Sequence, residues 1–107
     1  MTRDSQLPIP ALPSDFLLQY RDDARDKLAA IRAADRTPMG RNEIGRLAHS
    51  LKSTSFLLGY QSAAECARRL ELAAEAAAPS KISSLIEDLA QSLVPIFQDD
   101  SATSFRP

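Results

Sequence analysis

Apolar residues recur every three or four positions along most of the chain, the spacing that places them on one face of an α-helix. The first such stretch begins at Ser14, which follows Pro13 and is suited to cap a helix N-terminus. It ends before residues 37–40, Thr-Pro-Met-Gly, a combination that breaks helices. We therefore predict a first helix between these two signals. Its predicted core positions are Phe16, Leu17, Tyr20, Ala24, Leu28 and Ile31.

The second helix is predicted to begin between Pro38 and Asn42 and to end at Gly59, because glycine favours a helix C-terminus. Thr37 and Asn42 are both suitable N-caps, and the sequence does not choose between them. The predicted core positions of this helix are Ile44, Leu47, Leu51, Thr54 and Leu58.

The third helix is predicted from about Ser62 to Ala78, where Pro79 ends it. Ser80 is the expected N-cap of the fourth helix, and Pro95 is expected to kink that helix or end it early. The predicted core positions of the third helix are Ala63, Cys66, Ala67, Leu70, Ala74 and Ala77. Those of the fourth are Ile82, Leu85, Ile86, Leu89, Leu93 and Phe97.

Four amphipathic helices with short links predict an all-α fold, an antiparallel up-down-up-down four-helix bundle. Alternating β-branched runs and hairpin signals are absent from the sequence, which argues against strands. We expect the bundle to span residues 14–99. Residues 1–13 hold three prolines and are expected to form an extended N-terminal segment, and residues 100–107 a flexible C-terminal tail.

The composition of the chain lacks the residues from which most classes of enzyme build their sites. A chain of 107 residues is one domain. One histidine and one cysteine cannot close a structural zinc site or an internal disulfide, so no metal is expected. Three glycines leave no phosphate-binding loop and no ATP-binding segment, which excludes autokinase activity. With no secretory or membrane-spanning stretch, we expect a cytoplasmic protein that does not contact membranes.

Charge is unevenly distributed along the chain. Residues 25–52 carry seven basic and three acidic side chains, whereas the whole chain has a net charge of −1. A net acidic chain is a poor nucleic-acid binder, although the basic segment attracts anions. The only histidine, His49, lies in that segment.

The helical wheel directs His49 to solvent, because it falls roughly 170° from the centre of the predicted core face. Gly45 and Ser53 lie one turn to either side, and both are small. An exposed helical glycine costs about 1 kcal/mol relative to alanine, and close approach by a partner would compensate for it. From spacing alone, a functional histidine and an ordinary surface histidine are equally favoured.

The residues around His49 can also be assigned from their spacing. Arg46 and Lys52 lie three positions away on either side and could meet an anion on the ring. Phe56 lies seven positions after His49 and Tyr60 one turn further, outside the core stripe. Phe56 could instead lie under the N-terminal segment.

The segment from His49 to Gly59, His-Ser-Leu-Lys-Ser-Thr-Ser-Phe-Leu-Leu-Gly, resembles the signature of histidine-containing phosphotransfer (HPt) domains. That signature has a phosphoacceptor histidine, then leucine and lysine, a small residue, and Leu-Gly near the helix end. Leu47-Ala48 and residues 66–71, Cys-Ala-Arg-Arg-Leu-Glu, are similar to the family as well. The resemblance covers about residues 14–99. Ser53 departs from it, since the family usually has glycine there.

The resemblance implies a four-helix bundle with His49 as phosphoacceptor and Lys52 as a phosphate-stabilising cation. It implies a phosphorelay protein that needs no cofactor of its own and is monomeric. Its expected partners are response-regulator receiver domains, which hold Mg²⁺ in their own site, and a hybrid sensor histidine kinase. The wheel, not the resemblance, adds a phosphate-stabilising role for Arg46 and partner-docking roles for Gly45, Ser53, Phe56 and Tyr60.

An interaction module is the main alternative. Such a module would bind and inhibit a kinase or receiver without phosphorylation of His49. A self-associating bundle is less favoured, because it would need a second apolar stripe beyond Phe56 and Tyr60.

Overall fold

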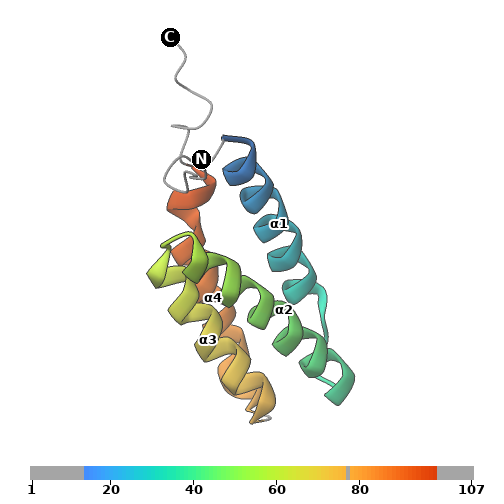
Figure 1. The fold of residues 1–107 in the computed structure, drawn as a ribbon. Coiled ribbons are helices and arrows are strands. Elements are labelled where there is room, and N and C mark those ends of the chain that lie inside the picture. The colour runs from blue at the N-terminus through green and yellow to red at the C-terminus, as the bar shows by residue number, and fades with distance from the viewer. Residues whose placement is uncertain (1–13, 77, 99–107) are drawn as a thin grey trace, which may run out of the picture.

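The computed structural model describes residues 14–76 and 78–98. They form four helices, α1 (Ser14–Ala33), α2 (Pro38–Leu57), α3 (Gln61–Glu75) and α4 (Pro79–Phe97). The chain reverses direction at each of the three links (Figure 1), so the predicted antiparallel all-α bundle is confirmed. The predicted N-terminal segment 1–13, the tail 100–107 and the core position Ala77 lie outside the described residues. No helix of the described part is long and apolar enough to cross a membrane.

The ends of α2 follow the sequence signals closely. Thr37 is the N-cap, and its hydroxyl accepts a hydrogen bond of 3.1 Å from the Gly40 amide, with Pro38 at the first helical position. Asn42 lies inside the helix. Gly59 follows the C-terminus with a φ of 86°, a left-handed conformation that glycine adopts without strain. The predicted stop at Gly59 is therefore confirmed.

The link between α3 and α4 differs from the prediction. The third helix ends at Glu75 and not at Ala78. Ala78 itself is non-helical, with φ −107° and ψ 71°, as expected for the residue before a proline. Pro79 opens α4, where its missing N–H costs nothing, and Ala78 is the N-cap without a side-chain hydrogen bond. Ser80 therefore lies inside α4 and is not its cap. Pro95 does not stop α4, which continues to Phe97.

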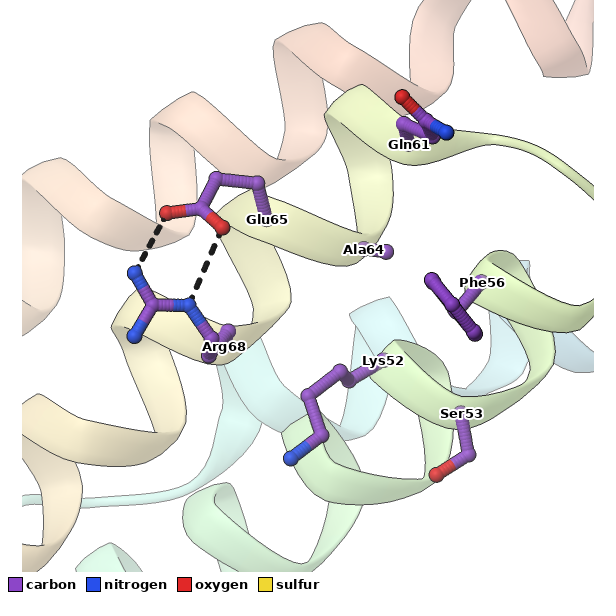
Figure 2. Close-up of a pocket in the computed structure, with 7 residues that line it drawn as sticks. All are labelled: Lys52, Ser53, Phe56, Gln61, Ala64, Glu65 and Arg68. Atoms are coloured by element: carbon purple, nitrogen blue, oxygen red, sulfur yellow. Dashed lines mark hydrogen bonds and ion pairs between the residues drawn. The ribbon is translucent and has the colours of Figure 1, made fainter.

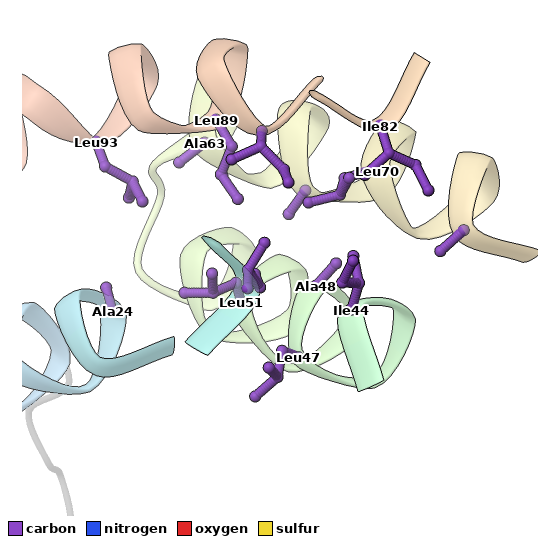
Figure 3. Packing of buried hydrophobic residues seen from close by; sticks show 14 of the residues in the cluster. Ala24, Ile44, Leu47, Ala48, Leu51, Ala63, Leu70, Ile82, Leu89 and Leu93 are labelled. Carbon is purple, nitrogen blue, oxygen red and sulfur yellow. The ribbon is translucent and has the colours of Figure 1, made fainter. Parts of the chain in front are cut away.

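The core lies between the apolar faces of the four helices (Figure 3). Helix α2 packs most extensively against α3, where small side chains allow close approach, and α1 contacts both α2 and α4. The largest fully buried hydrophobic side chains are Ile31, Ile44, Leu51, Leu70, Ile82, Leu89 and Leu93. All seven occupy positions that the periodicity predicts as core.

The buried face of α2 is rotated relative to the prediction. Ala48 and Ser55 are buried together with Ile44, Leu47 and Leu51, whereas Thr54 and Leu58 are only partly buried. Ser55 is accommodated because its hydroxyl lies 2.7 Å from the buried Tyr20 hydroxyl, so both polar groups are satisfied. The rotation turns α2 toward α3 and brings His49 to the edge between these two helices.

One predicted core position is wrong. Phe16 is 41% exposed and, with Leu57, borders a hollow of about 160 Å³ between the start of α1 and the end of α2.

Candidate functional site

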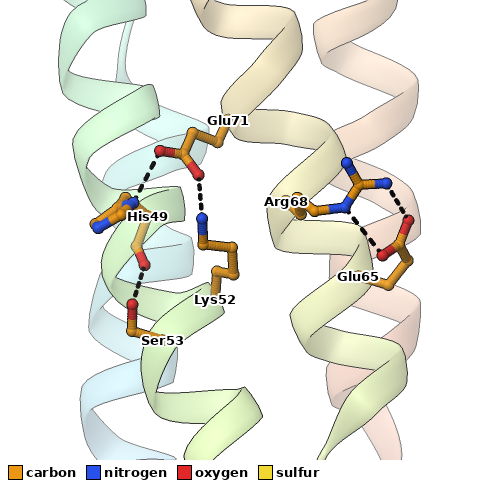
Figure 4. Close-up of polar contacts among 6 residues, drawn as sticks. All are labelled: His49, Lys52, Ser53, Glu65, Arg68 and Glu71. Atoms are coloured by element: carbon orange, nitrogen blue, oxygen red, sulfur yellow. Dashed lines mark hydrogen bonds and ion pairs between the residues drawn. The ribbon is translucent and has the colours of Figure 1, made fainter.

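His49 projects from the middle of α2 with 60% of its side chain exposed (Figure 4). The prediction of an outward imidazole is confirmed. The ring does not stand free of its own chain, however, because Nδ1 lies 2.8 Å from Oε2 of Glu71 on α3. One edge of the ring is therefore anchored to the neighbouring helix.

Glu71 is shared between two side chains of α2. Its Oε2 contacts His49, and its Oε1 accepts a 3.0 Å bond from Nζ of Lys52. Only 16% of the Glu71 side chain is exposed. Burial raises the pKa of Glu71, but the hydrogen bonds from Lys52 and His49 outweigh burial and hold the pKa below its ordinary value. Glu71 is therefore a carboxylate at neutral pH.

This carboxylate fixes the chemistry of the imidazole. An ionised carboxylate only accepts hydrogen bonds, so Nδ1 of His49 must carry the proton. In the neutral ring the lone pair then lies on Nε2, at the opposite edge. Glu71 thus selects one tautomer and aims a single nucleophilic nitrogen away from the helix pair.

Arg46 and Gly45 lie on the side of His49 toward the start of α2. They border a hollow of about 320 Å³ that His49 and Glu71 also line. Arg46 is exposed and pairs at 2.5 Å with Glu43 one turn before it, rather than with Glu71. A Cβ placed on Gly45 would lie 3.6 Å from Cβ of Ala74, so part of the space that Gly45 leaves is used by α3. Gly45 is thus half-buried rather than fully exposed, and its docking role stays a prediction.

Ser53 and Phe56 lie on the other side of His49, with Lys52, along a hollow of about 530 Å³ between α2 and α3 (Figure 2). Ser53 donates a 3.1 Å bond to the His49 carbonyl, and 70% of Phe56 is exposed. Tyr60 does not share this surface, because it is partly buried and stacks on Tyr20 at 5.4 Å between ring centroids. The structure thus separates the two aromatics that the sequence placed together.

Glu71 was absent from the predicted site residues. A signal for it exists, since His49 and Glu71 stand eleven residues to either side of Tyr60, where the antiparallel pair α2–α3 turns. Side chains at equal distances from such a turn lie at the same height on the two helices. Lys52 and Arg68, each eight residues from Tyr60, illustrate the same rule.

The described residues hold no group of three histidine, cysteine or acidic side chains that could bind a metal ion. The site therefore consists of one oriented nucleophile, its carboxylate partner and nearby cations. Such a set of groups suits the binding of an electrophilic, anionic group at the exposed edge of the ring.

Comparison with known proteins gives one finding. The family model described as Hpt domain matches residues 15–94, which include all of the side chains around His49 described above. No curated protein and no solved structure matches the chain. Because the match spans most of the chain, this protein belongs to the Hpt domain family, whose members carry phosphoryl groups between the proteins of phosphorelays.

Proposed function

We propose that His49 accepts a phosphoryl group from the aspartyl phosphate of a receiver domain and passes it to the aspartate of another receiver. One observation carries the proposal. The Glu71 carboxylate holds Nδ1 of His49 at 2.8 Å, which leaves Nε2 as the exposed nucleophile. Phosphoryl transfer needs positioning and charge neutralisation more than covalent machinery, and both are present here.

The transfer step needs no reactants other than the imidazole of His49 and the aspartyl phosphate. The Nε2 lone pair attacks phosphorus in line, and the bond between phosphorus and the aspartyl oxygen breaks with its electron pair. The P–N bond that forms leaves the ring with its Nδ1 proton and a positive charge, which faces the Glu71 carboxylate. Onward transfer reverses these steps on a second receiver, and the electron pair of the P–N bond returns to Nε2.

The cations of α2 contribute charge to the phosphoryl oxygens. Lys52 lies three residues after His49, and its ammonium can turn from Glu71 to a phosphoryl group as a point charge. Arg46 lies on the other side of the ring and is more exposed, so its contribution is the weaker one. The Mg²⁺ that assists the transfer is expected in the receiver's own site.

The docking surface surrounds the exposed ring. Phe56 supplies exposed apolar area, and the small Gly45 and Ser53 allow a receiver to approach the helix closely. A hybrid sensor histidine kinase is the expected source of the phosphoryl group. A contribution of Tyr60 to docking would be indirect, through its packing against Tyr20.

The test is labelling of the purified chain by phosphorylated receiver domains. We expect an acid-labile, base-stable phosphate on the wild-type chain and none on His49→Gln, while the circular dichroism spectrum stays unchanged. His49 is the only histidine, so any phosphohistidine is assigned without mapping. Glu87→Gln removes a carboxylate that pairs with Arg32 and not with any residue of the site, so it should label like the wild type.

Two results would contradict the proposal. Full labelling of His49→Gln would show that another residue is the acceptor. Tight binding of receivers without labelling of the wild type would favour the inhibitory interaction module instead.

A further inference from the structure

The hollow of about 530 Å³ next to the His49 site combines an apolar wall with a charged rim on which cations outnumber carboxylates (Figure 2). Phe56 on α2 and Ala64 on α3 supply the apolar part. Lys52 and Arg68, which stand at the same height on the two helices, border it with cations, and the Glu65 carboxylate that pairs with Arg68 lies on the same rim. With two cations and one carboxylate on its rim, the hollow can take an apolar side chain that lies next to a negative charge.

Arg68 is held in place by its own helix. Its Nε and Nη2 donate to the two oxygens of Glu65 at 3.1 and 2.6 Å, a two-point contact that fixes the guanidinium plane. Arg69 donates to the same carboxylate at 3.2 Å. Two cations therefore share one anion, and this group of three side chains carries a net charge of +1.

Arg68 still has hydrogen-bonding capacity. A guanidinium has five N–H donors, and the bonds to Glu65 use two of them. No partner for Nη1 is found among the described residues, and about half of the side chain is exposed. Because Glu65 has already ordered the side chain, little rotamer entropy remains to be lost when a second carboxylate binds.

We propose that Arg68 is a specificity-determining residue that selects receiver domains presenting a carboxylate beside the apolar side chain that enters this hollow. The inference rests on the proposed function, since the partner is the same receiver that meets His49. Lys52 pairs with Glu71 beside the imidazole, whereas Arg68 pairs with Glu65 away from the ring and keeps N–H donors for the body of the partner. Arg68 thus affects which receiver binds and not the chemistry at His49.

The test compares Arg68→Ala with Arg69→Ala. Both arginines contact Glu65, but only Arg68 borders the hollow, so the pair controls for loss of a cation from the same cluster. We measure binding of purified receiver domains by calorimetry at two salt concentrations. Transfer is then measured from chain phosphorylated chemically with phosphoramidate.

For the receivers that the wild type serves, Arg68→Ala should weaken binding about fivefold, as expected for a partly exposed ion pair. It should also reduce the salt dependence of binding and leave the maximal transfer rate unchanged. Arg69→Ala should match the wild type, and Arg68→Lys should recover part of the loss.

Equal effects of the two alanine variants, or none from Arg68→Ala, would overturn the inference while His49 labelling still supports the proposed function. If receivers bind the wild type but do not label His49, only the proposed function is overturned. The effects of Arg68→Ala and Arg69→Ala can still be compared from the binding measurements. Failure of every receiver to bind the wild type would overturn both.

Discussion

The role assigned to Glu71 leads to a kinetic prediction for Glu71→Gln. The glutamine carbonyl can still accept the Nδ1–H bond, so the substitution removes the charge and keeps the contact. A hydrogen bond to a charged partner contributes about 1.5–3 kcal/mol, and a neutral one about 0.5–1.5 kcal/mol. The difference of about 1 kcal/mol falls on the step in which the ring becomes positive. We expect transfer to His49 to slow about fivefold.

Two measurements distinguish this electrostatic effect from a structural one. Rapid-quench assays with a phosphorylated receiver should give a lower maximal rate and an unchanged half-saturating concentration. Long-range ¹H–¹⁵N spectra of the unphosphorylated chain should show the proton on Nδ1 in the wild type and in Glu71→Gln, and a mixture of tautomers in Glu71→Ala. Glu87→Gln is the control, because that carboxylate contacts Arg32 and not His49, Lys52 or Arg46.

Glu71 also holds Lys52, so the two contributions have to be separated. A double-mutant cycle with Lys52→Met does this. If Glu71 acted only by placing Lys52, the double variant would be no slower than Lys52→Met alone. That outcome, or a wild-type rate for Glu71→Gln, would refute the reasoning from the imidazole tautomer.

Three further predictions follow from other contacts. Gly45→Ala should raise the free energy of unfolding in urea by up to about 1 kcal/mol, because the new Cβ meets Ala74 at an ordinary contact distance. The same variant should weaken receiver binding, because a partner that approaches the helix at Gly45 would meet the added methyl group. Gly40→Ala should lower stability in the same assay, because its Cβ would collide with the backbone carbonyl of Asp35; a neutral effect would mean that this turn can open. Two guanidinium partners lower the pKa of Glu65 from 4.5 to about 2, so the stability of the wild type relative to Glu65→Gln should be fully present above pH 4.5 and decline as the pH falls toward 2. A pH-independent difference would contradict that ion pair.

Periodicity predicted which residues form helices and most of the core, because burial of an apolar face is a property of each helix alone. It did not predict what each helix packs against. The spacing predicts a core position for Phe16, yet this side chain lies beside Leu57 on the rim of a hollow between α1 and α2 and stays 41% exposed. Ser55 was missed because its burial depends on the Tyr20 hydroxyl, thirty-five residues earlier in the chain.

The functional site shows the same difference between properties of a single helix and contacts between helices. The exposure of His49 followed from its own helix, whereas the contact with Glu71 depends on how α2 and α3 align across their turn. The rotation of α2 toward α3 could not be read from its apolar stripe, because Ala48 and Ser55 carry little hydrophobic signal. The equal number of residues from the turn at Tyr60 to His49 and to Glu71 is the sequence signal that predicts this contact.

The buried pair of hydroxyls from Tyr20 and Ser55 also bears on how faithfully the helices are aligned. Apolar helix faces made largely of alanine and leucine can shift along one another by one helical turn at modest cost in free energy, because one methyl group can take the place of another. A hydroxyl without a partner in the interior costs about 1–3 kcal/mol. Within the part that the structure describes, the Ser55 hydroxyl is buried and pairs with the Tyr20 hydroxyl, so α2 is held at the one position along α1 where these two groups meet. Fixing the position of α2 along its axis in this way would keep the imidazole at a constant height on the four-helix bundle, whichever receiver binds.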